Sequence, residues 1–435
     1  MPLFKKVCGS SQNEPAQRPP KEREGAFDVK RNLTWKQFFF ILPLLAIVSV
    51  FSLYPILSSF SYTLFDYRTN DQQHAKLFLK SSLNVSLFYE DCDYIAYYLE
   101  GDIPLVEESD RAAFESVSAD LKAMMARLEG AESIVALSGK DAAELSAFLD
   151  DIGARMDAVY GRYPDVQFYN RDKMPVLLDE MRSCFINTNF TGLESYKVLL
   201  SDKRFASSLG HTLLFTGVSV AIELLLGLSL ALIMNKAIKG VGIVRTTSLI
   251  PWAIPTAVSA LIWSYLYDGG SGVVAQVFYK LGFIAAPEHM LLSASGAMAA
   301  AILADVWKTT PYMALLLLAG LQTIEPGLYE SASIDGATGC KAFLRITLPL
   351  LKPSILVALL FRTLDAFRVY DLIAVLTGGG PGGATETLSV YAYKVMVSQS
   401  NYGYGSVIVV AMFACVAAIA FVFVRVLGAE LIHDD

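Results

Sequence analysis

Charged residues are scarce in this 435-residue chain: they make up 18% of it, against roughly 25% in an average soluble domain. Hydrophobic residues account for 54%. This imbalance argues against a purely soluble protein. The net charge is −7, so the chain also lacks the basic balance that is typical of nucleic-acid-binding proteins, and we expect no nucleic-acid partner.

Metal ligands and catalytic motifs are also missing. The chain has only four histidines, and its five cysteines have no metal-ligand spacing, so no metal site is expected. It contains no phosphate-binding Gly-x-x-x-x-Gly-Lys-[Ser/Thr] loop, no Gly-x-Ser-x-Gly and no His-Glu-x-x-His. We therefore expect neither catalysis nor a bound cofactor on this chain.

Six apolar runs dominate the rest of the sequence, each near the roughly 20 residues that cross a hydrocarbon core. Each contains small residues, which favours packing of the helices into a bundle. We predict an all-α membrane protein with six transmembrane helices. The runs cover residues 38–64, 209–234, 247–266, 297–321, 354–376 and 406–426.

Basic residues predict the orientation of these helices. Residues 1–36 carry eight Lys or Arg and no apolar run, so we expect a cytoplasmic tail and no cleaved signal peptide before the first span, 37–65. Alternation then places the loops after the second and fourth spans in the cytoplasm, together with the C-terminal tail, 428–435. Both loops are basic, with Lys236, Lys239 and Arg245 in one and Lys341, Arg345 and Lys352 in the other.

The long connection 66–206 carries the acidity of the chain, with 25 Asp or Glu against 15 Lys or Arg. Apolar residues recur at three- and four-residue steps over 114–128 and over 145–159, and Ser138 and Gly139 separate the two stretches. We predict a folded extracytoplasmic insertion with a helical hairpin, whose acidic surface is a candidate docking site for an external partner. An oxidising compartment would allow its two cysteines, Cys92 and Cys184, to form a disulfide.

The most specific motif lies between the fourth and fifth spans, within 326–353. Residues 329–337 read Tyr-Glu-Ser-Ala-Ser-Ile-Asp-Gly-Ala, and nine residues after Gly336 the chain reads Ile-Thr-Leu-Pro. The first part is predicted to be a short helix, and Gly336 permits a tight turn after it. The second part is predicted to be an amphipathic helix that Pro349 and Pro353 end before the next span.

This pattern resembles the coupling segment of binding-protein-dependent ABC importer permeases, with Ser331 replacing the first Ala of the family's Glu-Ala-Ala. The resemblance covers about residues 190–427 and implies the type I ABC importer permease fold, with its core at 207–427. In that family the segment fits a cleft on an ATP-binding subunit, and the Glu is an important contact. The coupling residues implied are Glu330, Ser331, Ala332, Asp335, Gly336, Ala337, Ile346, Leu348 and Pro349.

The resemblance also implies partners and a location. It implies two ATP-binding subunits that carry ATP and Mg and hydrolyse the ATP, a second and different permease subunit, and an extracytoplasmic sugar-binding protein. The chain is then a multi-pass protein of a bacterial inner membrane, embedded in lipid.

Two predicted spans contain ionisable residues, each costing at least about 2.5 kcal/mol at mid-membrane unless it faces water or a counter-charge. In the fifth span, Arg362, Asp365, Arg368 and Asp371 recur every three residues with alternating sign. This spacing fits an ion-pair ladder along the helix, and it equally fits a polar path for a substrate. Asp305 and Tyr312 in the fourth span add a hydrogen-bonding group and an aromatic ring, which suit a sugar.

Resemblance to carbohydrate permeases of the family implies a disaccharide of trehalose or maltose type as the substrate. The substrate-path positions implied are Asp305, Lys308, Thr309, Tyr312, Arg362, Asp365, Ala366 and Val369. Two alternatives remain open from the sequence: an ion-driven secondary transporter that uses the charged fifth span, and a membrane sensor with an acidic ectodomain.

Overall fold

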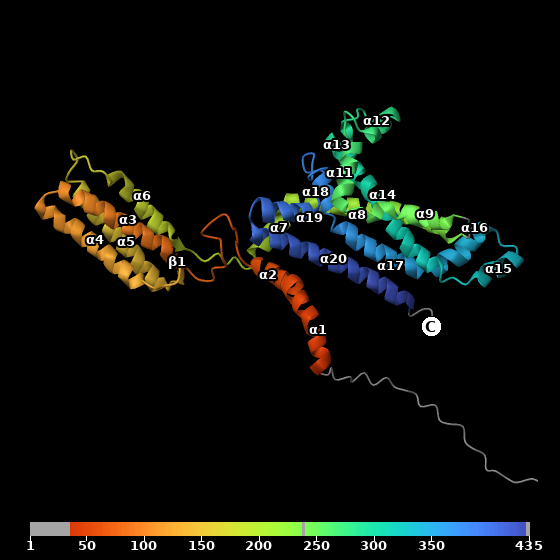
Figure 1. Ribbon diagram of the computed structural model, residues 1–435, viewed down its shortest axis with the longest axis horizontal. Coiled ribbons are helices and arrows are strands. Elements are labelled where there is room, and N and C mark those ends of the chain that lie inside the picture. Colours follow the sequence, from red (N-terminus) through yellow and green to blue (C-terminus); the bar gives the residue numbers. More distant parts are fainter. Residues whose placement is uncertain (1–34, 237–239, 432–435) are drawn as a thin grey trace, which may run out of the picture. The chain divides into compact units, whose positions relative to one another are not determined.

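The computed structural model describes residues 35–236 and 240–431, and the side chains of 39–236 and 240–426 (Figure 1). Most of the predicted N-terminal tail, Lys239 and the last four residues lie outside the described residues. The chain divides into a unit that ends at Pro55 and a unit that begins at Ile56. The first unit holds α1 (Trp35–Val48) and a π-helical turn (Ser49–Leu53), and α2 (Tyr54–Tyr62) leads into the second.

Within the described ranges, five helices are long and apolar enough to cross a membrane. They match the first, second, fourth, fifth and sixth predicted spans, although their ends differ. They are Phe39–Tyr62, Lys203–Asn235, Ala294–Leu321, Gly339–Phe367 and Tyr402–Val426.

The third predicted span, 247–266, is present as a bent pair of helical segments and not as one continuous helix. Here α9 (Val241–Ser248) and α10 (Ile250–Ala253) end before an extended Ile254, and α11 (Thr256–Leu266) continues at 91° to them. Pro255 explains the break, because proline disfavours helical geometry in the residue before it and has no N–H to donate.

The fifth span also differs from its prediction of 354–376. The helix begins at Gly339 with α16 (Gly339–Ala342), passes through a π-helical turn (Phe343–Thr347) and ends with α17 (Leu348–Phe367). Pro349 and Pro353 therefore lie inside the helix and do not end it. The π-helical turn precedes Pro349 and shifts the hydrogen-bond register where that proline has no N–H.

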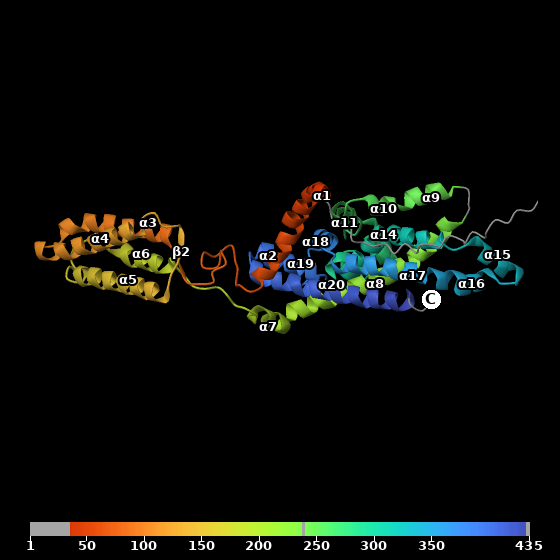
Figure 2. The same cartoon turned by 90° about the horizontal axis from the view of Figure 1, so that it is seen from below.

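The core of the membrane part is built on α8 (Lys203–Asn235), α14 (Ala294–Leu321) and α17, with α20 (Tyr402–Leu431) beside α17 (Figure 2). Glycines permit the close approach of these helices. A Cβ on Gly227 of α8 would lie 2.7 Å from Met313 Cγ of α14. A Cβ on Gly320 of α14 would overlap the hydroxyl of Ser354 in α17.

The insertion has its own hydrophobic core and is mainly helical (Figure 1). The predicted hairpin is confirmed as α4 (Glu108–Leu128) and α5 (Gly139–Tyr160), and a Ser138–Asp141 capping box begins α5. Not predicted were α3 (Val85–Asp102), α6 (Met174–Ser183) and an antiparallel sheet of order β2-β1-β3. Its strands are β1 (Ser82–Asn84), β2 (Ile134–Ala136) and β3 (Phe185–Ile186).

The two cysteines of the insertion are buried free thiols, in contrast to the disulfide that the sequence allows. The Cys184 thiol instead donates a hydrogen bond to the Asp91 carboxylate, with Sγ 3.7 Å from Oδ2. Burial and the nearby Glu180 carboxylate raise the pKa of Asp91 to about 6, although the hydrogen bond from Cys184 opposes the shift. The cysteines therefore pack as apolar side chains around a buried carboxyl group.

This raised pKa predicts how the stability of the insertion depends on pH. Because the pKa of Asp91 is 3.8 when unperturbed and about 6 when folded, its stabilising contribution is lost as pH rises through this interval. We expect Asp91→Asn to stabilise the insertion by about 1–3 kcal/mol at neutral pH and to have little effect at about pH 4. Amide hydrogen exchange of α3 and α6 in the intact protein measures this. The exposed Asp93→Asn is the control, and equal effects of Asp91→Asn at both pH values would contradict the prediction.

Candidate functional site

A cavity of about 720 Å³ lies beside α14, the end of α17 and the break in the third span. This is within the roughly 300–1,000 Å³ common for small-molecule sites. Seven of the eight predicted substrate-path residues line it: Asp305, Lys308, Thr309, Arg362, Asp365, Ala366 and Val369. The eighth, Tyr312, is not part of the lining, but its ring stacks on that of the lining residue Trp252, with 5.7 Å between centroids.

A buried ion cluster lies at one wall of this cavity. Arg362 of α17 is 1% exposed, and it binds the fully buried Glu223 of α8 through two hydrogen bonds, Nε–Oε2 at 2.5 Å and Nη2–Oε1 at 2.9 Å. The same guanidinium donates to the carboxylate of Asp305 in α14. Thr309 donates to Glu223 as well, with 2.8 Å between Oγ1 and Oε1. One arginine therefore joins three helices, and its counter-charges offset the cost of burying it.

The ion-pair ladder that the spacing of the fifth span allowed does not extend beyond its first step. Arg362 does pair with Asp365, at 3.1 Å from Nη1 to Oδ2. The helix then ends at Phe367, Arg368 donates to the carbonyl of Leu364, and Asp371 begins a separate helix, α18 (Asp371–Leu376). The side chain of Asp365 is 65% exposed, so it presents a carboxylate to the cavity while it pairs with Arg362.

Glu223, the main partner of Arg362, was not predicted from the sequence. Glu223 lies in the middle of the second predicted span, where a single carboxylate among apolar residues was itself a signal for a buried ion pair. Its partner is 139 residues away in sequence, so spacing alone does not identify the pair.

Lys308 of α14 binds the backbone at the break in the third span. Its ammonium donates to the carbonyl of Ile254 at 2.5 Å and to that of Trp252 at 3.4 Å. These carbonyls lie at the break, where the helix no longer supplies N–H partners. The lysine therefore satisfies the exposed backbone of the break and holds Trp252 next to Tyr312.

The predicted coupling segment forms a helix and a turn followed by a second helix. Glu330, Ser331 and Ala332 lie on α15 (Pro326–Ile334), and Gly336 adopts a φ of +75° after it. A hydrogen bond of 2.9 Å between the hydroxyls of Tyr329 and Thr347 joins the two parts of the segment.

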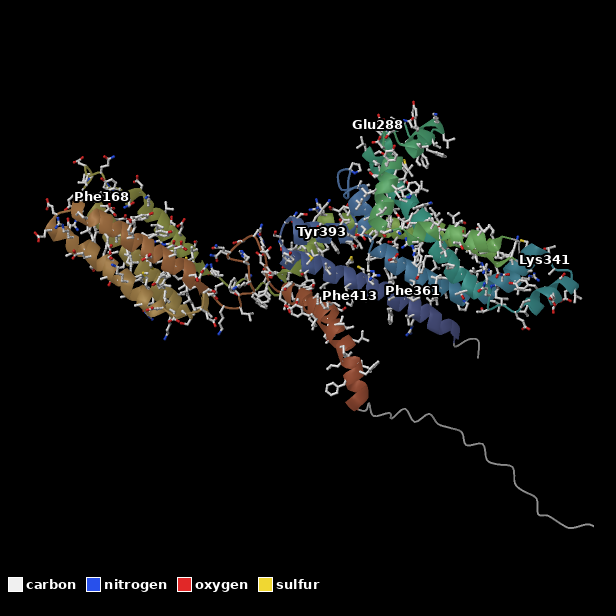
Figure 3. The ribbon with its side chains drawn as sticks, in the orientation of Figure 1. Phe168, Glu288, Lys341, Phe361, Tyr393 and Phe413 are labelled. Atoms are coloured by element: carbon white, nitrogen blue, oxygen red, sulfur yellow. The ribbon has the colours of Figure 1, made fainter. Side chains whose placement is uncertain are left out.

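Most of the coupling segment is accessible. Ile334 is 87% exposed, and no atom lies within 4 Å of a Cβ built on Gly336, so the turn leaves open space around it. Figure 3 labels Lys341 on α16 in this part of the chain. The remaining predicted coupling residues are exposed or partly exposed: Asp335, Ala337, Ile346, Leu348 and Pro349.

Residues 223–433 match the family described as binding-protein-dependent transport system inner membrane component. The chain is 47% identical over 237 residues to the trehalose/maltose transport system permease protein MalF of Thermococcus litoralis, covering 54% of this chain and 79% of that protein. It is 44% identical over 243 residues to the trehalose transport system permease protein SugA of Mycobacterium tuberculosis, covering 56% and 76%.

A more distant relative and a solved structure extend the comparison. The chain is 42% identical over 240 residues to the sulfoquinovosyl glycerol transport system permease protein SmoG of Agrobacterium fabrum, covering 55% of this chain and 77% of that protein. Its fold is similar to a chain of a bacterial ABC transporter involved in the import of alginate, with a TM-score of 0.50 and 24% identity. That similarity covers 55% of this chain and 84% of the other.

The ion cluster predicts a large loss of stability when one partner is removed. Glu223→Gln leaves Arg362 undercompensated, and we expect a loss of about 3–5 kcal/mol. Glu223→Gln with Arg362→Gln should cost clearly less than the sum of the single changes, because the uncompensated charge is gone. Asp365→Asn, at the exposed pair, should cost less than about 1 kcal/mol. Thermal unfolding in detergent gives the comparison, and additive effects of the two Gln variants would refute the coupling.

Proposed function

The chain belongs to the family of binding-protein-dependent transport system inner membrane components and is a multi-pass permease of a carbohydrate importer; on this premise we propose that it imports a disaccharide of the trehalose type. Two relatives named for trehalose transport, at 47% and 44% identity, support this substrate. The ion-driven carrier and the sensor are not favoured by these relatives.

The observation that carries the proposal is the composition of the cavity. Asp365 offers a carboxylate that accepts hydrogen bonds from sugar hydroxyls, and Lys308 also lines the cavity. Trp252 and Tyr370 contribute aromatic rings to the lining, and such rings suit the apolar faces of a pyranose. The proposed path is therefore the cavity between α14, α17 and the broken third span.

The proposed mechanism is alternating access. The insertion lies on the extracytoplasmic face, and a loaded binding protein docks on that face. Both termini of the chain are cytoplasmic. Two ATP-binding subunits hold ATP and Mg, and their closure moves the coupling segment. A second permease chain receives the other ATP-binding subunit, because this chain has one coupling segment. The accessibility of the segment and the open space around Gly336 support such a contact.

The substrate proposal predicts that Asp365 contributes to transport affinity. In proteoliposomes that contain the whole importer and its binding protein, we expect ATP-dependent uptake of trehalose. Asp365→Ala should raise the KM for loaded binding protein or lower the maximal rate by about tenfold or more, since a hydrogen bond to a charged group is lost. Glu288→Gln is the control, because Glu288 is an exposed residue at the N-cap of α13 (His289–Leu292) and does not line the cavity (Figure 3). Uptake that needs an ion gradient and no ATP would refute the function.

The coupling segment predicts a separate loss of function. Glu330→Lys should reduce uptake by about tenfold or more while the protein stays in the membrane, because an exposed contact with the ATP-binding subunit changes sign. Ser331→Ala, which gives the residue usual in the family, should retain uptake. Transport and membrane level are measured on the same cells, and wild-type uptake by Glu330→Lys would exclude the coupling role.

A further inference from the structure

A second cavity, of about 680 Å³, lies between the start of α8 and the loop that follows α18. The start of α8 contributes Lys203, Arg204 and His211, and the loop contributes Gly382 and Gly383. Glu386 and Lys394, on either side of α19 (Leu388–Tyr393), complete the wall. The cavity is separate from the proposed sugar path, and neither the coupling segment nor the ion cluster of Arg362 contributes to it.

One buried carboxylate positions the cations of this cavity. The side chain of Glu386 is 5% exposed and accepts two hydrogen bonds from Arg204, at 2.7 Å and 2.9 Å, and one from Lys394 at 2.9 Å. Although burial alone would raise it, these bonds hold the pKa of Glu386 below its usual value. Arg204 also lies over the ring of Tyr391, 4.6 Å from the centroid. The cations are therefore held in place.

The cavity keeps an excess of positive charge. Lys203 is exposed and, among the described residues, makes no ion pair. Glu386 is the one carboxylate of the lining, against three cations in Lys203, Arg204 and Lys394. A cavity with this charge balance favours an anionic group.

The rim of the cavity includes two glycines whose backbone no other side chain covers. Gly382 and Gly383 have φ of +56° and +85°, and no atom lies within 4 Å of a Cβ built on either. The loop that carries them is held by a 2.7 Å hydrogen bond between the hydroxyls of Thr377 and Thr385. A side chain of a partner can therefore approach the cations over a rim without side chains.

This cavity lies at the end of the membrane part from which the insertion emerges. Asp202, next to Lys203, accepts hydrogen bonds from Tyr391 and from Tyr404 at 2.5 Å and 2.7 Å. The neighbouring Gly403 donates to the carbonyl of Tyr67, at the base of the insertion, at 2.9 Å. The segment 66–206 has ten more acidic than basic residues. The basic lining of the cavity therefore contrasts with the net negative charge of this segment.

We propose that this cavity receives an acidic side chain of the extracytoplasmic binding protein when that protein docks. The inference rests on the proposed function, which places the insertion and this end of the spans on the side where the binding protein arrives. A complementary charge pair at the edge of an interface orients the partners and increases the rate of association. The net negative charge of the insertion disfavours an anionic group there, so the cavity also determines where the acidic side chain of the partner docks.

Charge reversal of Lys203 in the assembled importer tests this proposal. The importer is placed in nanodiscs of zwitterionic lipid, and the Kd of its purified binding protein is measured at low and high salt. Lys203→Glu should weaken binding by about tenfold at low salt and less at high salt, because the interaction is electrostatic. Lys197→Glu, an equally exposed lysine on α7 (Glu194–Ser201) outside the cavity, should change the Kd by less than about twofold.

A second variant tests whether docking needs the volume of the cavity, independently of its charge. Ser207→Trp places a large neutral side chain at the exposed wall and should weaken docking at both salt concentrations. Equal Kd values for wild type, Lys203→Glu and Ser207→Trp would overturn the proposal. So would a Lys203→Glu effect that appears only when anionic lipid is added, since the cavity would then bind lipid headgroups. Wild-type stimulation of ATP hydrolysis by the binding protein, measured in the same discs, reports on the proposed function independently of these variants.

Discussion

A single buried arginine organises the membrane part of this permease. Only 1% of the surface of Arg362 is exposed, so its charge must be compensated within the protein. Glu223 and Asp305 supply that compensation from α8 and α14. The three helices are therefore fixed relative to one another at one point, and the cavity opens next to that point. Asp365, the third carboxylate on the arginine, lines the cavity and is the most exposed of the three.

The break in the third span is the second requirement of the cavity. Backbone groups that leave a helix at membrane depth are tolerated where they face protein or a water-filled space. The carbonyls of Trp252 and Ile254 meet this condition through the ammonium of Lys308. A straight third helix would not expose these groups, and the wall of the cavity would be built by side chains alone. The cavity and the broken helix are thus two aspects of the same local structure.

Much of this architecture is accessible from the sequence, for clear physical reasons. Membrane-spanning helices need long apolar runs, and the amphipathic period of α4 and α5 shows in a single sequence. The coupling motif is local, so the turn at Gly336 was predictable. The strands of the insertion were not, because segments of two or three residues show no alternation. The pairing of Glu223 with Arg362 was also missed, because it is a long-range contact between separate spans.

Local signals misled where proline was concerned. Pro349 and Pro353 suggested a helix end, but a π-helical turn before them lets the helix continue. Pro255, within an apolar run of adequate length, does break its helix. The difference lies in hydrogen-bond register and in neighbouring helices, which a single sequence does not display.

The central claim is that the cavity next to the Glu223–Arg362 pair is the sugar path. A cryo-electron microscopy structure of the whole importer, trapped with disaccharide during transport, tests it most directly. We expect density for the sugar in contact with Asp365 and Trp252, and we expect the ion pair of Arg362 and Glu223 to be intact in the same structure. Density for the sugar at a site that shares none of these residues would contradict the account.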